Sequence, residues 1–220
     1  MTCVFSRGLK AGLFAAAAAV FCAVSCSLKA DGETMLRYAK ARSLYAEGRL
    51  DEALAGLEGA GHFFPALVLR GKAEYFSGDS TKAEKTFRRA LRLRPSAAEA
   101  GLYLARTLRE GQKADEARAL LEALVADDPL DIRALRLAAS LEDDRGPPGR
   151  AAALAFLDRA AEASSECALV FLDRARLRWI AGKGDEALED LNRARVLLSP
   201  GTPLFRAVEK LESAIREASA

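Results

Sequence analysis

Histidine and cysteine, on which most metal sites and many catalytic sites depend, are scarce in this chain. Its 220 residues include one histidine, His62, and four cysteines. A lone histidine cannot supply a general base together with the group that orients it, nor a set of metal ligands. The spacings G-x-S-x-G, H-E-x-x-H and C-x-x-C are absent as well. We therefore expect no enzymatic activity, no catalytic residue, no cofactor and no metal, and interpret the acidic run Glu142-Asp143-Asp144 as solvated surface.

A strong excess of charge of one sign is also missing. The chain has 33 lysines and arginines against 31 acidic residues, and two of the basic residues, Arg7 and Lys10, lie near the N-terminus. Without those two residues the numbers are equal. Nucleic-acid binding rests on many contacts between basic side chains and phosphates, so we expect no nucleic-acid partner.

A run long enough to span a bilayer is absent, but the N-terminus contains a shorter apolar run. The uncharged segment Ala11–Val24 follows Arg7 and Lys10, and it is about 14 residues long, where a membrane-spanning helix needs roughly 20. This pattern is typical of a bacterial export signal. We expect residues 1–26 to be the signal peptide and residues 27–33 a short tether.

The end of that segment resembles a lipoprotein signal, because small residues precede Cys26. The resemblance implies that Cys26 carries a lipid and becomes the N-terminus, anchored to the inner or outer membrane of a bacterial envelope and facing the periplasm. The alternative is cleavage by an ordinary signal peptidase, for instance after Ala30, which would give a soluble periplasmic protein. In either case Cys167 remains as the one cysteine of the folded part, so we expect no disulfide there and interpret Cys167 as a small core residue.

A period of 34 residues runs through the rest of the chain. Ala83 returns as Ala117, Phe87 as Leu121 and Pro95 as Pro129. In the second half of each period, residues spaced by three and four form one stripe of a helix. The stripes are Ala53, Leu57 and Ala60; Ala83, Phe87 and Ala90; Ala117, Leu121 and Leu124; Ala153, Leu157 and Ala160; and Ala187, Leu191 and Ala194. The first halves carry the small residues Ala41, Gly71, Ala105, Ala139 and Ala175.

These features resemble the tetratricopeptide repeat, a helix–turn–helix unit of 34 residues. The resemblance implies an all-α fold, a right-handed α-solenoid of about five helix pairs over residues 34–200; another helix–turn–helix family would give almost the same fold. The interval from Ala53 to Ala83 is short at 30 residues, and the interval from Ala117 to Ala153 is long at 36, with Pro147-Pro148 where the extra residues must form a loop. Arg70 and Arg174 replace the usual leucine before the small residue.

Two helix starts carry further signals. Ser96 and Glu99 have the spacing of a capping box. Thr202 and Pro203 suit the N-cap and the first position of a last helix. Residues 201–220 are therefore expected to form a capping helix, with an apolar stripe at Leu204, Phe205, Val208, Leu211 and Ile215. Two helices in each of five units and the cap give eleven helices.

One face of the first helices is expected to bind a partner. It combines basic residues with aromatic and aliphatic ones, which suits a protein or peptide with acidic groups or a free C-terminal carboxylate. The candidate groove residues are Tyr38, Arg42, Tyr45, Lys72, Tyr75, Leu102, Arg106, Arg109, Arg136, Leu172, Arg176 and Trp179. The alternative is that the arginines only bridge neighbouring helices or pair with acids such as Glu110 and Asp173.

The resulting functional hypothesis is a membrane-anchored, non-enzymatic scaffold or adaptor in the periplasm, for example in envelope assembly. Two alternatives stay open at this point. The array could bind a small ligand or a transporter subunit, or it could form a homo-oligomeric structural component.

Overall fold

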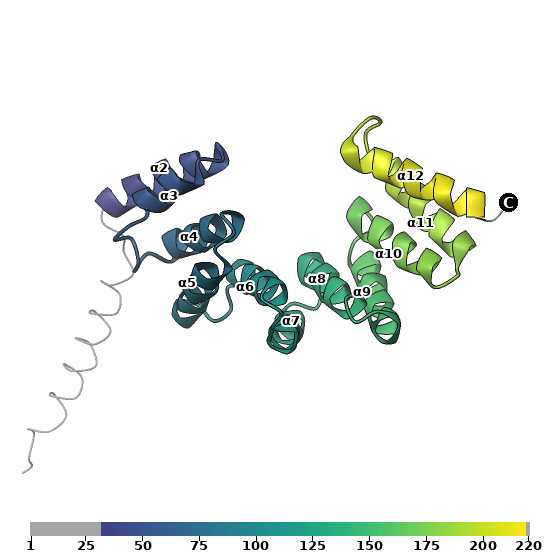
Figure 1. The fold of residues 1–220 in the computed structure, drawn as a ribbon, viewed down its shortest axis with the longest axis horizontal. Helices are drawn as coiled ribbons and strands as arrows, with labels where there is room; N and C mark the ends of the chain where they lie inside the picture. Colours follow the sequence, from purple (N-terminus) through teal and green to yellow (C-terminus); the bar gives the residue numbers. More distant parts are fainter. Residues whose placement is uncertain (1–31, 219–220) are drawn as a thin grey trace, which may run out of the picture. The chain divides into compact units, whose positions relative to one another are not determined.

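The computed structural model describes residues 32–218, and the predicted signal peptide and Cys26 lie outside these residues (Figure 1). The described residues form eleven α-helices and one short 3₁₀ helix, without a strand, which confirms the all-α prediction and the helix count. The helices are α2 (Gly32–Ala46), α3 (Leu50–Gly56), α4 (Phe64–Phe76), α5 (Ser80–Leu93), α6 (Ala98–Glu110), α7 (Ala114–Asp127), α8 (Ile132–Asp143), α9 (Arg150–Ala163), α10 (Ala168–Ile180), α11 (Gly184–Val196) and α12 (Pro203–Ala218). The 3₁₀ helix η1 spans Pro147–Gly149.

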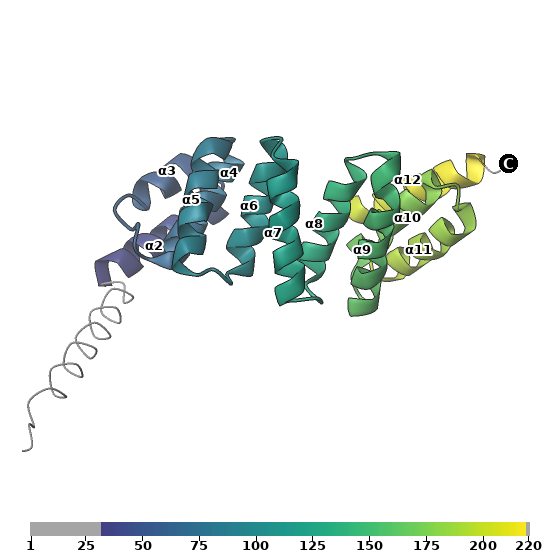
Figure 2. The ribbon, with the colours of Figure 1, turned by 90° about the horizontal axis from the view of Figure 1, so that it is seen from below.

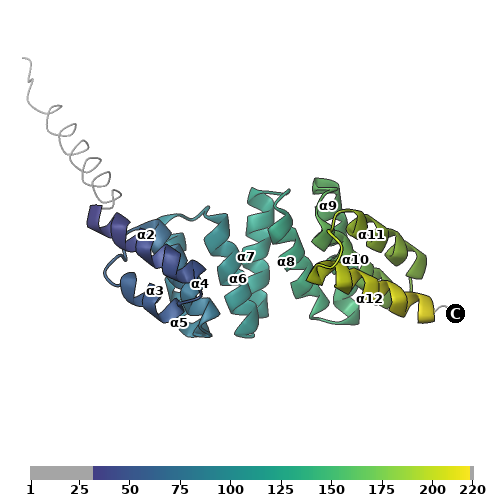
Figure 3. The same ribbon diagram turned by 90° about the horizontal axis from the view of Figure 1, so that it is seen from above.

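The chain divides into two compact units, with the boundary after Pro95. In the first unit α2 packs on α3 and α4 on α5; in the second, α6 packs on α7, α8 on α9 and α10 on α11. Figures 2 and 3 show the two helices of each pair lying side by side. The fold is thus an α-solenoid of helix pairs, as the period of the sequence predicts.

The predicted stripes form the core of each helix pair. The small residue of every first helix and the first two residues of every second-helix stripe are buried. The two helices of the second pair approach closely at Gly71, where a Cβ atom would lie 2.6 Å from Cε1 of Phe87. Phe87 itself is fully buried, so its ring fills the space that the missing side chain of Gly71 leaves.

One departure from the repeat is balanced by a second departure on the facing helix. The third stripe ends in Leu124 where other stripes end in alanine, and α6 has Gly101 at the facing position. A Cβ atom on Gly101 would lie 3.0 Å from Cδ2 of Leu124. In three of the other four pairs the position equivalent to Gly101 holds a large apolar residue, and the facing stripe ends in a small one. These equivalents are Leu67, Leu135 and Phe171, with Ala90, Ala160 and Ala194 in the facing stripes.

The two irregular intervals have simple structural causes. In the first pair, α3 has only seven residues, and Leu57 and Ala60 are buried in the turns that follow it. In the fourth pair, η1 takes up the extra residues, as the Pro147-Pro148 pair predicts. Gly149 is required there because a Cβ atom would lie 1.9 Å from the carbonyl oxygen of Glu142.

The turn inside each pair contains one residue with a left-handed backbone. This residue is Gly48, Gly78, Gly146 or Gly182 in four of the pairs, with φ between 72° and 82°. In the third pair it is Gln112, with φ 59°. Glycine adopts this conformation without a steric penalty, so the turn explains why glycine recurs at this position of the repeat.

The predicted starts of two helices have different outcomes. Thr202 accepts a hydrogen bond from the backbone N–H of Phe205 at 3.3 Å, as expected for an N-cap. The capping box at Ser96 is wrong: α6 begins one residue later, with Ala97 as its N-cap and no side-chain cap bond. Cys167 is likewise not a core residue, because it is the partly exposed N-cap of α10.

The last helix covers the core of the last pair. Val208 and Ile215 of α12 are at most 1% exposed and belong to one cluster with Ala187 and Leu191 of α11. Within residues 32–218, no helix combines the length and the apolar character that a membrane span needs.

Candidate binding site: a basic pocket in the second unit

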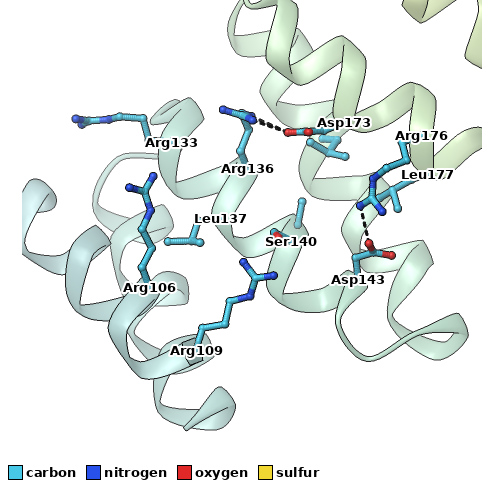
Figure 4. Close-up of a pocket in the computed structure, with 12 residues that line it drawn as sticks. Arg106, Arg109, Arg133, Arg136, Leu137, Ser140, Asp143, Asp173, Arg176 and Leu177 are labelled. Atoms are coloured by element: carbon cyan, nitrogen blue, oxygen red, sulfur yellow. Dashed lines mark hydrogen bonds and ion pairs between the residues drawn. The ribbon is translucent and has the colours of Figure 1, made fainter. Parts of the chain in front are cut away.

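A pocket with a cavity volume of about 290 Å³ lies in the second unit between side chains of α6, α8 and α10. Apolar residues line it, including Leu157 of α9, together with several arginines, whose side chains are drawn in Figure 4. The lining residues are Arg106, Arg109, Arg133, Arg136, Leu137, Ala139, Ser140, Asp143, Leu157, Asp173, Arg176 and Leu177. Five arginines thus face a lining with two carboxylates.

Helical spacing brings these side chains together. Residues three and four apart lie on one face of a helix. On α8 the positions 133, 136, 140 and 143 follow this rule, and on α6 Arg106 and Arg109 do. Figure 4 shows both α6 arginines extending on the side of α6 that faces α8. The pocket is therefore built by equivalent faces of successive first helices.

Three of the predicted groove arginines form ion pairs between first helices. Arg136 Nε lies 2.8 Å from Asp173 Oδ2, and a terminal nitrogen of Arg176 lies 2.6 Å from Asp143 Oδ2 (Figure 4). A terminal nitrogen of Arg109 lies 2.9 Å from Oδ1 of Asp144, the C-cap of α8. All three arginines thus bridge neighbouring helices, which was the alternative interpretation of the sequence.

Arg106 differs from the other four arginines of the pocket. It has no acidic partner among residues 32–218, and its guanidinium lies 5.2 Å from the ring centre of Tyr103. Arg133, which sequence reasoning missed, pairs with Asp131, the N-cap of α8, at 2.9 Å. The signal for Arg133 was its three-residue spacing from Arg136. Arg106 is therefore the one uncompensated positive charge of the pocket within the described part of the chain.

The candidate residues of the first unit lie outside this pocket. They form an aromatic surface on α2 and α4, in which the Lys72 ammonium lies 5.6 Å from the ring centre of Tyr45. Phe76, another residue missed from the sequence, is 54% exposed and has its ring centre 5.2 Å from that of Tyr75. Tyr38 and Arg42 belong to the same unit: Tyr38 packs edge-on against Phe63 at 5.4 Å, and Arg42 is exposed.

Three candidates of the second unit do not line the pocket. Leu102 is 4% exposed and belongs to the core. Leu172 and Trp179 are partly buried and pack against the hydrophobic cluster that includes α12. The prediction assigned too wide a face of each helix to the groove. The face that lines the pocket is narrower than the apolar face that packs against neighbouring helices.

The arginines that replace leucine in the repeat have structural partners. Arg70 pairs with the buried Glu74 at 2.8 Å, and Arg174 pairs with the fully buried Asp190 at 2.6 Å. Burial alone lowers the pKa of the Arg174 guanidinium, but its bonds to Asp190 and Asp158 outweigh this effect and raise it above its ordinary value. The pair of Arg174 with Asp190 joins α10 to α11 and is buried, whereas the pair of Arg70 with Glu74 lies within α4 and leaves Arg70 partly exposed.

Glu142 of α8 is a similar buried carboxylate, so the interpretation of this residue as solvated surface is wrong. Burial tends to raise the pKa of Glu142, but hydrogen bonds from Arg118 and Arg145 hold it below its usual range, so the group is ionised at neutral pH. In residues 32–218 no group of three or more histidine, cysteine or acidic side chains is arranged to hold a metal ion. His62 is exposed in the turn before α4.

Comparison with known proteins supports the fold. Residues 68–132 match the family model described as tetratricopeptide repeat. A tetratricopeptide repeat protein from Parabacteroides merdae has 20% identity and a TM-score of 0.69, covering 86% of this chain and 74% of that one. MamA from Desulfovibrio magneticus RS-1 has 21% identity and a TM-score of 0.64, covering 76% and 95%.

A third solved structure is YrrB, described as a tetratricopeptide repeat protein with an unusual peptide-binding site. It has 20% identity and a TM-score of 0.57, covering 79% of this chain and 90% of that one. No curated protein shows significant similarity. Together with the helix pairs and the buried stripes, these matches show that the chain has the fold of tetratricopeptide repeat proteins.

Proposed function

We propose that this protein is a non-enzymatic scaffold whose basic pocket captures an acidic segment of a protein partner. The observation that carries the proposal is the pocket itself: five arginines line it together with apolar side chains, and Arg106 has no acidic partner in residues 32–218. A carboxylate can form charge-assisted hydrogen bonds with such guanidinium groups. Apolar side chains, among them Leu137, also line the pocket.

Two comparisons support a binding role. Repeats of this kind generally serve as non-catalytic scaffolds for proteins or peptides, and residues 68–132 match their model. YrrB, which shares the fold, has a peptide-binding site of its own. Neither comparison identifies the partner of this chain, which we define by its chemistry as an extended segment with carboxylate groups.

The pocket predicts a strong dependence of binding on Arg106. We expect Arg106→Glu to weaken capture of a glutamate-rich peptide by at least about tenfold, because a desolvated charge-assisted contact contributes roughly 1.5–3 kcal/mol. Fluorescence anisotropy with a labelled hexaglutamate peptide measures the effect. Arg106→Lys keeps the charge but loses the planar fork, so it should give an intermediate loss.

The matched control is Arg206→Glu, which makes the same charge change at an exposed position of α12. It should alter binding by less than about twofold, and neither arginine substitution should change the free energy of unfolding by more than about 0.5 kcal/mol. Equal losses in Arg106→Glu and Arg206→Glu would contradict the pocket and indicate attraction by net charge alone.

We also propose that the scaffold is tethered to a bacterial envelope membrane through a lipid on Cys26 and faces the periplasm. Support comes from the sequence of residues 1–26, which lie outside the described part of the structure. Two acyl chains, each stabilising by about 0.8 kcal/mol per buried methylene, suffice for stable attachment.

Replacing the proposed lipid site should change where the protein resides. We expect Cys26→Ala either to release the protein from the membrane fraction or to block its processing. Cell fractionation with labelled fatty acid measures both. Cys22→Ala is the control, since Cys22 precedes the proposed cleavage site, and it should leave labelling unchanged. Labelling that persists in Cys26→Ala would refute the anchor.

A further inference from the structure

Two ion pairs cross one wall of the basic pocket in opposite directions. Arg136 of α8 reaches Asp173 of α10, and Arg176 of α10 reaches back to Asp143 of α8 (Figure 4). All four side chains line the pocket. The pocket therefore contains carboxylates that already bind two of its guanidinium groups.

We propose that Asp143 and Asp173 act as internal competitors of the ligand, so that an acidic segment binds by exchange and displaces them from Arg176 and Arg136. This inference rests on the proposed function of the pocket. It assigns to the two aspartates the control of affinity, while Arg106 provides the contact for which no exchange is needed. The ligand class becomes narrower as well: a segment that carries several carboxylates gains more than one with a single acidic group.

The exposure of the two pairs makes exchange feasible. The side chains are 28% and 38% exposed in the pair of Arg136 with Asp173, and 50% and 18% exposed in the pair of Arg176 with Asp143. Partly solvated pairs are weak, since water screens the attraction and stabilises the separated charges. Displaced aspartates can therefore be solvated again at small cost.

Unused donors remain on both guanidinium groups. A guanidinium carries five N–H donors. Arg176 uses one terminal nitrogen toward Asp143, and Arg136 uses Nε and one terminal nitrogen toward Asp173. An incoming carboxylate can thus form its first hydrogen bond before the internal one breaks. The guanidinium group is then never without an acidic partner during the exchange.

A neighbouring ion pair shows the contrasting case. Asp190 is fully buried and accepts hydrogen bonds from both Arg174 and Arg178, at 2.6 and 2.9 Å. Separating these charges would leave a carboxylate without partners in the core. A pair of a guanidinium group with a carboxylate therefore stabilises the fold where it is buried, and it can exchange partners where it lies at the pocket wall.

The test removes the competing charges while keeping the side-chain shape. We expect Asp143→Asn combined with Asp173→Asn to bind labelled hexaglutamate at least about tenfold more tightly than the wild type, equivalent to about 1.4 kcal/mol. The matched control is Asp115→Asn with Asp185→Asn, which makes the same change of net charge at two exposed positions outside the pocket lining. The control should tighten binding by less than about threefold, through long-range attraction only.

Three outcomes separate this inference from the proposed function. Tighter binding in the pocket variant than in the control supports the inference. Wild-type binding that depends on Arg106 but does not increase in the pocket variant overturns the inference and leaves the function standing. An absence of binding in both the wild type and the pocket variant overturns both. The single variant Asp173→Asn, at the more exposed aspartate, gives the same comparison with a smaller expected gain if circular dichroism shows that the double variant is unfolded.

Discussion

Replacing Phe87 by alanine should lower the free energy of unfolding of the first unit by about 3–5 kcal/mol. Phe87 is fully buried, and its ring occupies the space beside Gly71, so truncation leaves a cavity. Chemical denaturation followed by circular dichroism measures the loss of helix. The one tryptophan of the chain, Trp179, lies in the second unit, so its fluorescence monitors that unit separately.

The size pairing of Gly71 with Phe87 gives this prediction a sharp control. Gly71→Ala alone should destabilise, because the added Cβ atom would lie 2.6 Å from the Phe87 ring. The double change Gly71→Ala with Phe87→Leu reproduces the buried pair Ala105 and Leu121 of the next repeat, and it should recover part of the loss. Additive effects in this double-mutant cycle would show that the two residues do not pack as described.

Removing the last helix should have an effect of similar size on the second unit. Deletion of residues 203–220 uncovers the cluster around Leu191, where Val208 and Ile215 of α12 are buried. Terminal repeats need a cover with a polar outer face to stay soluble. We expect the truncated protein to aggregate or to lose at least about 3 kcal/mol of stability, in line with the loss of several buried aliphatic side chains.

A point substitution tests the packing of α12 without shortening the chain. Val208→Asp should place a charge in the cluster and destabilise by several kcal/mol, on the order of 3 or more. Ala207→Asp, at the adjacent exposed position, should remain within about 0.5 kcal/mol of the wild type. Light scattering and the emission of Trp179, which packs against this cluster, measure both variants. Solubility and stability that do not change in the truncated protein and in Val208→Asp would refute the covering role.

The core of this fold could be predicted from the sequence because it depends on local spacing. A large apolar residue follows a small one by four positions in each stripe, and both are buried in every pair, including Leu57 beyond the short helix α3. The size pairing of Gly101 with Leu124 was harder to find. Periodicity compares each helix with the equivalent helix of the next repeat. This pairing is seen only when the two helices of one pair are compared with each other.

The pocket was predicted only in part, because ion pairs depend on which neighbouring helix a side chain reaches. The three ion pairs between first helices join residues 33, 35 and 37 positions apart, close to the period of the repeat. Opposite charges separated by about one period were therefore the signal that would have identified Asp143 and Asp144 as partners, in addition to Asp173, which the sequence had suggested. Leu102 was placed in the groove because periodicity identifies a helix face but does not say how much of that face a neighbouring helix covers.

The pairing of Gly101 with Leu124 also limits how this chain can be recombined. Exchanging α7 for the sequence of α5 would put Ala90 opposite Gly101 and leave a void, and the reverse exchange would put Leu124 opposite Leu67 and overfill the pair. A complete helix pair keeps the two residues of such a size pairing together. Duplication, deletion or engineered shuffling of these repeats should therefore succeed with whole pairs and fail with single helices.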